Sequence, residues 1–310
     1  MATLATTTTN FSDLVQELVM SQAEEELRAS LPHTTPGNYE PGRIIKGTNL
    51  IRFARYPDLS AATTPITQGT APTSRALSIE SETLSVAQYG DVLEWTDLAE
   101  LDSPHDVVAI GAERAARVAA LTIDTIVRDV LAAGTNVKYS NGSARSLVSA
   151  TITGAMVKQM FWFLQTSNVP TFWDGTYRAI ITPEQAYNIE ADTATGGWMD
   201  AHKYVDNAPL LSGEVGRYAG VRFLVSDNAK VFTTAGASSA DVHSAYFMGP
   251  KSYAIGDSQT LRAYFIPRGG DHSDPLAQLG KLGWKVRFGS ILIDQAGARY
   301  VRLETAATTL

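Results

Sequence analysis

The sequence predicts an α+β fold organised around one long helix. Residues 103–134 carry apolar side chains at helical spacing without interruption. Before them, two extended stretches (50–56 and 76–95) flank a polar segment that has no apolar periodicity. After them, short strands and helices alternate up to residue 257, and further strands follow near the C-terminus. A chain of 310 residues is long enough to bury a substantial core around these elements.

The long helix is expected to begin at Ser103 and to end at Gly134. A serine hydroxyl can accept a hydrogen bond from the first turn, and Pro104 suits the first helical position. Asp106 lies three residues after Ser103, which is the spacing of a capping box. Gly134 would end the helix in the left-handed conformation that glycine favours.

One apolar stripe runs along this helix, because apolar residues recur every three or four positions. The stripe consists of Val108, Ala112, Ala115, Ala119, Ile123, Ile126 and Val130. Glu113 and Arg117, like Asp124 and Arg128, are four residues apart. Both pairs are expected to form ion pairs on the exposed side of the helix.

The N-terminal region divides into three parts. Residues 1–10 are rich in threonine and are expected to form a flexible arm, and residues 11–31 have the apolar spacing of an amphipathic helix. That helix could pack on its own subunit or dock on a neighbouring one. Residues 33–47 are rich in proline and glycine and are predicted to be a linker.

The two extended stretches are predicted to form a protruding hairpin. The segment between them, 57–74, is small, polar and punctuated by proline. Leu77 and Ile79 alternate in one phase and Leu84 and Val86 in the other, which indicates a bulge or a strong twist. A two-stranded arm cannot bury its own apolar face, so a neighbouring subunit is the simplest cover.

Beyond the long helix, an interleaved α/β unit is expected. Asn141-Gly142 could close a hairpin, 153–166 has a helical pattern, and 177–182 is a short buried strand. Pro183 would open a helix capped by Thr182, and 191–213 is a long loop. Further strands are predicted at 221–225, 245–248, 253–255 and 261–267. The last strands, 284–294 and 298–304, are apolar enough to form a sheet under the long helix.

Composition excludes several classes of protein. The chain has no cysteine, which removes disulfides, thiolate metal sites and cysteine nucleophiles. A formal net charge of −7 argues against a nucleic-acid reader, which usually has a basic face. The first residues do not have the pattern of a signal peptide, and no apolar stretch is long enough to span a membrane. A protein made in the cytosol, with no membrane partner, is therefore expected.

Motifs that carry catalytic chemistry are absent, so no enzyme and no cofactor are expected. The chain contains no Gly-rich phosphate loop, no G-x-S-x-G and no His-Glu-x-x-His. The one candidate metal site is Asp271, His272 and Asp274, where a turn of solvated polar residues is the simpler interpretation. Trp162, Trp173 and Trp198 lack interleaved basic residues and are interpreted as core or interface residues.

Several stretches resemble tailed-bacteriophage major capsid proteins of the Hong Kong 97-like fold, and their N-four-type branch in particular. The order of elements is also that of these proteins. The matching stretches are RYPDLSAATTPITQGTAPT (55–73), VAQYGDVLEWTD (86–97), SPHD (103–106), RDVLAAGTNV (128–137) and ITPEQAY (181–187).

The resemblance implies a division into named parts. Residues 1–47 would be the N-terminal arm and 48–96 the extended E-loop. Residues 97–149 would be the first part of the peripheral (P) domain, with the spine helix at 103–134. Residues 150–257 would form the axial (A) domain, and 258–310 the returning P-domain strands and the C-terminal tail.

The resemblance also implies a function. The protein would assemble with itself as hexamers and pentamers into the icosahedral shell of the virion, in the cytoplasm of the host bacterium. The shell would enclose double-stranded DNA without sequence-specific contacts, and its inner face should be neutral or acidic. A cellular encapsulin-type nanocompartment shell and, less well supported, a metal-dependent enzyme using 271–274 are the alternatives. Inter-subunit contacts are expected at Arg55, Asp58, Arg75, Glu80, Glu82, Trp198, Asp200 and His202.

The sequence departs from some members of this fold in two respects. No lysine occurs between Lys46 and Lys138, so the covalent crosslink that some relatives form through an E-loop lysine is not expected. Fewer than 50 residues precede the predicted E-loop, which leaves no room for a fused scaffolding segment. A separate scaffolding protein is therefore expected. A portal is a further expected partner, and external decoration proteins could also bind the shell.

Overall fold

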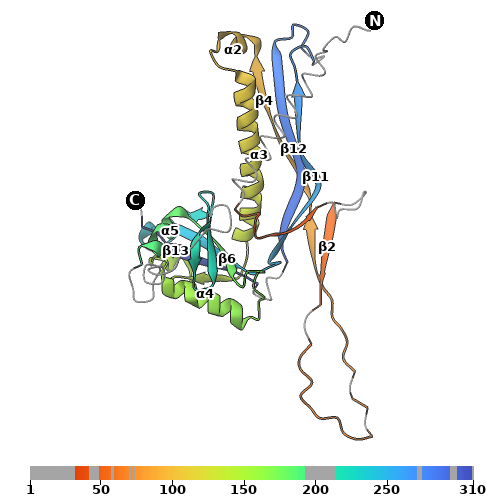
Figure 1. The fold of residues 1–310 in the computed structure, drawn as a ribbon, viewed down its shortest axis with the longest axis vertical. Helices are drawn as coiled ribbons and strands as arrows, with labels where there is room; N and C mark the ends of the chain where they lie inside the picture. Colours follow the sequence, from red (N-terminus) through yellow and green to blue (C-terminus); the bar gives the residue numbers. More distant parts are fainter. Residues whose placement is uncertain are drawn as a thin grey trace.

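The computed structural model describes residues 32–41, 49–56, 59–69, 71–72, 74–192, 214–270, 274–293 and 299–308. Figure 1 shows an elongated part, in which a long helix lies along a sheet, and a more compact part at the lower end of that helix. A narrow loop extends well beyond both parts. The two parts correspond to two separate sheets, and a third, two-stranded sheet forms the base of the loop.

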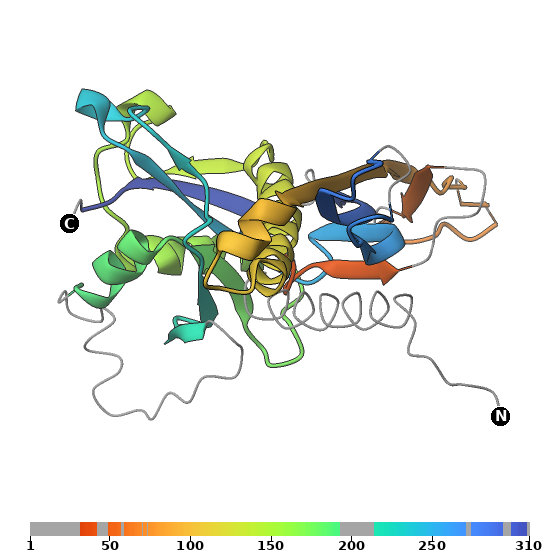
Figure 2. The ribbon, with the colours of Figure 1, turned by 90° about the horizontal axis from the view of Figure 1, so that it is seen from above.

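The elongated part consists of a four-stranded sheet and one long helix. The sheet has the strand order β1-β11-β12-β4, in which only β1 and β11 are parallel neighbours. Its strands are β1 (Asn38–Pro41), β11 (Tyr253–Ile266), β12 (Leu279–Leu292) and β4 (Ala87–Thr96). Helix α3 (Val107–Ala132) lies along one face of this sheet (Figures 1 and 2).

Helix α3 presents a face of mostly small side chains to the sheet. Its buried residues are Ala112, Ala115, Ala116, Ala119, Ala120, Asp124, Val127 and Leu131. The large side chains of this core come from the strands instead, with Trp95, Leu282, Trp284, Val286 and Phe288 buried against the helix. Because alanine projects so little, the helix can lie close to the bulky strand residues.

The predicted ends of the long helix need correction. A separate short helix, α2 (Asp97–Asp102), ends at Ser103, and α3 is capped by Asp106, whose carboxylate accepts from the backbone N–H groups of Val108 and Ala109. The Ser103 hydroxyl accepts instead from the backbone N–H of His105 (3.2 Å), in the turn between the two helices. Gly134 is not in the left-handed conformation. A Cβ there would lie 2.6 Å from the Tyr300 ring, so close packing explains the glycine.

The compact part contains a seven-stranded sheet with the order β5-β13-β10-β6-β8-β7, and β9 pairs with β10 beside this path. The strands are β5 (Val137–Tyr139), β6 (Tyr177–Ile181), β7 (Glu214–Tyr218), β8 (Val221–Val225), β9 (Val231–Phe232), β10 (Val242–Met248) and β13 (Tyr300–Ala306). Short 3-10 turns occur at Arg145–Leu147 and Ala237–Ser239.

Helices cover both faces of the seven-stranded sheet. Helices α4 (Gly154–Thr166) and α5 (Pro183–Glu190) bury their apolar sides on one face. The other face contacts the C-terminal half of α3 through Tyr246, Met248 and Tyr300. The predicted cap of α5 is confirmed, since Thr182 forms a capping box with Gln185, and Thr153 caps α4 in the same position before the first turn. In the described part of the chain, no helix is both long and apolar enough to cross a membrane.

Three strand predictions also need correction. Strand β13, expected under the long helix, pairs with β10 in the seven-stranded sheet, while β12 does lie under α3. The two short strands predicted at 253–255 and 261–267 are one bulged strand, β11. Asn141-Gly142 does not close a hairpin, because β5 pairs in parallel with β13 and the Asn141 side chain donates to the Leu147 carbonyl (3.0 Å).

Candidate assembly surfaces and the junction behind them

The protruding hairpin predicted from the sequence is confirmed. Strands β2 (Leu50–Arg55) and β3 (Glu80–Ser85) pair in antiparallel register. Ile51, Phe53 and Leu84 are buried at the base of this hairpin and pack against Ala254 of β11. One apolar face thus anchors the arm to the body, while the segment beyond it projects away (Figure 1).

The alternation of apolar residues changes phase between Leu77 and Val86 because this stretch changes its partner strand. Strand β3 pairs with β2, whereas β4 begins at Ala87 and pairs with β12. Leu77 and Ile79 precede β3 and are 68% and 63% exposed, whereas Leu84 and Val86 are buried. The stretch predicted as one strand is therefore two strands that belong to different sheets.

The tip of the arm exposes apolar side chains. Between β2 and β3, every residue whose burial the structure describes is exposed, including Tyr56, Leu59 and Ile66. Arg75 joins the two sides of the tip, because its guanidinium donates to the Ser60 carbonyl oxygen (2.5 Å). Exposed apolar groups on a projecting arm are typical of a docking surface.

The predicted contact residues are only partly described. Arg75, Glu80 and Glu82 are exposed on the arm, and the backbones of Arg55 and Glu80 are paired across β2 and β3. The structure therefore brings these four residues together on one projecting element. Asp58, Trp198, Asp200 and His202 lie outside the described residues.

The candidate metal loop is also only partly described, because Asp271 and His272 lie outside the described residues. The Asp274 carboxylate accepts from the backbone N–H of Leu279 (2.7 Å), which fits a turn residue. Among the described residues, no cluster of three or more histidine, aspartate or glutamate side chains could hold a metal ion.

Two tryptophans considered as core or interface residues lie on the surface of the compact part. Trp162 on α4 is 65% exposed, and Trp173 is 81% exposed. Trp173 is held in a turn in which the Phe172 carbonyl accepts from Gly175, and Asp174 beside it pairs with Arg222 at 2.7 Å. Burial opposes ionisation of Asp174, but its bonds to Thr176 and to the arginines outweigh burial and lower its pKa. Trp173 is therefore displayed on a rigid turn, and Trp198 lies outside the described residues.

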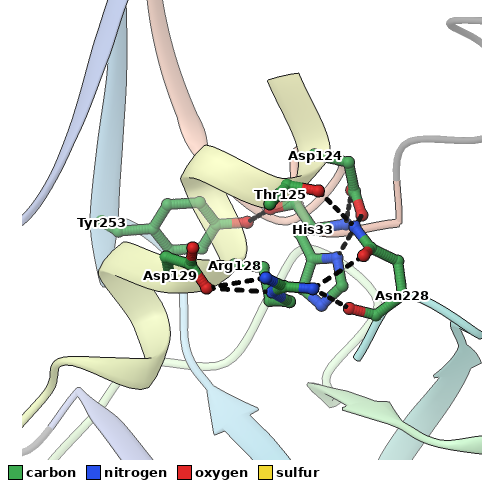
Figure 3. Close-up of polar contacts among 7 residues, drawn as sticks. All are labelled: His33, Asp124, Thr125, Arg128, Asp129, Asn228 and Tyr253. Atoms are coloured by element: carbon green, nitrogen blue, oxygen red, sulfur yellow. Dashed lines mark hydrogen bonds and ion pairs between the residues drawn. The ribbon is translucent and has the colours of Figure 1, made fainter. Parts of the chain in front are cut away.

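A buried polar junction fixes the chain where it emerges from the N-terminal region (Figure 3). His33 is fully buried, and both its backbone N–H and its Nδ1 contact the Asp124 carboxylate, at 3.1 and 2.7 Å. The Tyr253 hydroxyl donates to the His33 carbonyl oxygen. Residue 33 is thus held by α3 and β11 through its main chain as well as its ring.

The same carboxylate reaches the compact part. Asn228, which follows β8, donates its side-chain amide to Asp124 Oδ2 (2.7 Å). Arg128 donates to the side-chain oxygen of Asn228 (2.8 Å) and pairs with Asp129 (2.8 Å). The junction therefore joins the N-terminal region, α3 and the seven-stranded sheet in one network (Figure 3).

The expected surface pair of Asp124 and Arg128 is therefore wrong. Asp124 is fully buried, and its partners come from residues far away in the sequence. The sequence did contain a signal for the burial of Asp124. This residue lies four residues after Ala120 and three before Val127, and both of these apolar residues are buried. Helical spacing alone places Asp124 on the covered face.

A second junction holds the C-terminal end of α3. Arg302 of β13 donates to the Ala132 carbonyl oxygen, and the Tyr300 hydroxyl donates to that of Leu131. Glu304 lies beside Arg302 and receives two bonds from Arg145, each 2.7 Å. A cation at the last free carbonyls of a helix complements the helix dipole. Strand β13 thereby fastens the long helix to the seven-stranded sheet.

Comparison with known proteins agrees with this architecture. A family model described as phage capsid protein matches residues 79–301. No curated protein matches the sequence. The structure resembles the capsid of cyanophage Pam1, with a TM-score of 0.71 and 17% identity over 91% of this chain and 93% of that one.

Other solved phage capsids give similar values. The capsid of Ralstonia phage GP4 aligns with a TM-score of 0.68 and 14% identity over 91% of this chain and 90% of that one. The capsid of cyanophage P-SCSP1u covers the same shares at a TM-score of 0.66 and 14% identity. The chain belongs to the phage capsid protein family, and its fold is that of the Hong Kong 97-like major capsid proteins of tailed phages.

Proposed function

We propose that the protein assembles as hexamers and pentamers into the icosahedral shell that encloses a phage double-stranded DNA genome. The projecting hairpin arm is the observation that carries this proposal. Its base is anchored by a small apolar core, whereas Leu59, Ile66 and Leu77 at its tip are more than half exposed. Neighbouring subunits in a closed shell would cover such groups and bury a large area for each subunit.

In this proposal, the parts of the chain take the roles of a capsid subunit. Residues 1–47 act as the N-terminal arm, 48–96 as the E-loop, 97–149 and 258–310 as the P domain, and 150–257 as the A domain. The shell forms in the host cytoplasm with a separate scaffolding protein and a portal, and decoration proteins bind its outside. The packaged DNA makes no sequence-specific contacts, which suits the net charge of −7.

The family and the fold indicate a structural protein, and the phage family favours a viral shell over a cellular nanocompartment. The metal-dependent alternative at 271–274 would require a metal ion in the purified protein and an activity that is lost in the His272→Ala variant.

The experiment is electron microscopy of the purified chain, alone and together with the products of its neighbouring genes. Closed particles or rings of five and six subunits are expected. A variant in which 59–77 is replaced by a short Gly-Ser linker should keep the folded body and lose the closed particles, because the neighbours lose the exposed apolar tip. The matched control Ser81→Ala changes an exposed position of β3 and should assemble normally. A wild-type chain that stays monomeric under all these conditions would contradict the proposal.

A further inference from the structure

An asparagine side chain closes the loop 140–150, which is called the Asn141 loop below. The Oδ1 atom of Asn141 accepts from the backbone N–H groups of Ser149 and Ala150, at 2.9 and 3.3 Å. Its Nδ2 atom donates to the Leu147 carbonyl oxygen and to the Ser149 hydroxyl, each at 3.0 Å. These bonds hold both ends of the carboxamide against the far side of the loop.

The Asn141 loop also fastens the C-terminal strand β13. Arg145 of the loop donates two hydrogen bonds of 2.7 Å to the Glu304 carboxylate. The Ala150 carbonyl oxygen accepts from the backbone N–H of Ala306 (3.0 Å). A change in the order of this loop would therefore reach the strand that holds the end of α3.

Gly142 follows Asn141, and the geometry of the turn requires a glycine at this position. Its φ of +73° is a conformation that other residues rarely adopt. A Cβ at this position would lie 2.7 Å from the Cβ of Leu147. The fold thus needs Asn141 for its hydrogen bonds and Gly142 for its backbone, and it places this pair at an exposed turn.

An asparagine directly before a glycine is chemically reactive. The Gly142 nitrogen can attack Cγ of Asn141, so that a C–N bond closes a five-membered succinimide ring. The Cγ–Nδ2 bond breaks, and ammonia leaves with the proton of the attacking N–H. Water then opens the ring at either carbonyl group, which yields aspartate or isoaspartate.

The structure leaves the attacking group accessible. Glycine has no side chain that obstructs its own nitrogen. In the described part of the chain, the Gly142 N–H donates to no other group. The nucleophile is therefore not occupied, and the state of the Asn141 carboxamide decides how fast the ring can close.

The hydrogen bonds of Asn141 oppose the reaction. Attack converts the planar Cγ into a tetrahedral carbon, which turns Oδ1 and Nδ2 out of the plane in which their partners at 147–150 lie. Those bonds must be released first, so the loop has to open before the ring can close. Local opening that breaks several bonds at once is rare.

We propose that Asn141 is a site of deamidation and that opening of the Asn141 loop sets its rate. The new carboxylate cannot donate to the Leu147 carbonyl oxygen, and the two oxygens repel each other. The modified loop therefore closes less well and loosens its hold on β13. The reaction needs no assembled subunits, so this inference stands independently of the proposed function.

Peptide mapping by mass spectrometry tests the inference on the full-length chain during incubation in mildly alkaline buffer. Enzymatic methylation of isoaspartate identifies that product. The reference is the synthetic peptide of residues 139–145, in which no loop can form. We expect Asn141 to convert about tenfold more slowly in the chain than in this peptide. The internal control is Asn168, which is exposed but precedes Val169, whose branched side chain obstructs attack, and it should stay unchanged.

Two variants separate the role of the loop from the chemistry of the pair. Ser149→Ala removes one bond to Nδ2 and should raise the rate about fivefold. The matched control Ser146→Ala changes an exposed serine that forms no hydrogen bond with Asn141 in the described part of the chain, and it should leave the rate unchanged. Asn141→Asp reproduces one product and should speed hydrogen exchange in 144–150.

Three results would overturn the inference. If Asn141 stays unmodified even in the Ser149→Ala chain while the peptide converts, it is not a deamidation site. Equal rates in the wild-type chain and the peptide, or in the wild-type and Ser149→Ala chains, would show that the loop does not set the rate. Unchanged hydrogen exchange in the Asn141→Asp chain would show that the product does not loosen the loop.

Discussion

At the scale of single residues, His33 and Asp124 decide where the N-terminal region leaves the body. The Asp124 carboxylate accepts from the His33 main chain, faces its ring and also accepts from Asn228, which satisfies a buried acid three times. Buried polar groups are tolerated only when they are paired in this way. Periodicity could have placed Asp124 on the covered face, but its partners are 91 and 104 residues away and no local pattern identifies them.

The first prediction concerns Asp124→Ala. The change removes the acceptor of the buried His33 N–H groups and the nearer of two acceptors of the Asn228 amide, so the free energy of unfolding should fall by about 3 kcal/mol. Urea denaturation measures this loss, and hydrogen exchange should show faster exchange in 32–41. The control Glu113→Ala removes an exposed acid from the same helix and should change stability by about 0.5 kcal/mol or less. Equal losses in both variants would mean that the junction carries no special stability.

The second prediction concerns His243, which is buried on β10 with its Nδ1 3.1 Å from the Thr182 hydroxyl. Burial lowers its pKa from 6.5, although Glu184 and Asp241 oppose this effect. The unfolded chain therefore binds the proton more readily than the folded one. The stabilising contribution is complete above pH 6.5 and is lost as pH falls toward the lower folded pKa.

Denaturation at a series of pH values measures this dependence. His243→Gln should flatten the decline in stability below pH 6.5, because no imidazole remains to be protonated. His105→Gln, at an exposed position before α3, should leave the decline as it is. If the free energy of unfolding of the wild-type chain did not change as the pH falls below 6.5, the prediction would be contradicted.

At the scale of elements, local signals were reliable where the deciding contacts are local. The start of α5 was predicted correctly, because Thr182 caps a helix within three residues of itself, and the apolar spacing of 153–166 placed the start of α4 within one residue. The start of α3 was placed too early, because Ser103 and Asp106 are both good caps and the sequence does not rank them. The position of β13 was wrong for a different reason, since its pairing with β10 joins segments more than 50 residues apart.

The third prediction compares two glycines. Gly111 lies within α3, and apart from the adjoining backbone of the helix no atom lies within 4 Å of the position that a Cβ would take. Gly111→Ala should therefore stabilise the protein by about 1 kcal/mol through helix propensity alone. At Gly90 of β4, the Cβ would lie 2.6 Å from the Trp284 carbonyl oxygen, so Gly90→Ala should destabilise it. Thermal unfolding measures the change in melting temperature of each variant. Changes of the same sign in the two variants would contradict the prediction.

At the scale of the whole molecule, the shape suits a subunit that depends on its neighbours. The order of arm, long helix, α/β unit and returning strands was predictable from periodicity and from the family resemblance. The division into two sheets was not, because β11 pairs with β1 and β13 pairs with β10, strands far apart in the sequence, and no local pattern specifies these pairings. All eight predicted contact residues remain predictions, both those on the arm and those at 198–202.

The fourth prediction concerns covalent linkage in the mature shell. No lysine occurs between Lys46 and Lys138, so the arm offers no amine to a neighbouring side chain. Denaturing gels of mature particles should show a single band at the chain mass of 33.3 kDa. The Lys46→Arg and Lys138→Arg variants should run in the same way. A ladder of multiples of the chain mass would contradict the prediction.

The fastening of α3 by β13 has a mechanical consequence. Arg302 and Tyr300 hold the last carbonyls of the helix, so the helix and the four-stranded sheet packed on it would turn together about that end. From Val107 to Ala132 the helix is about 39 Å long, and it therefore acts as a lever with its fulcrum at the seven-stranded sheet. A rotation of about 5° at the fulcrum moves α2 by about 3 Å, so small adjustments between the two sheets become visible changes in the spacing of subunits.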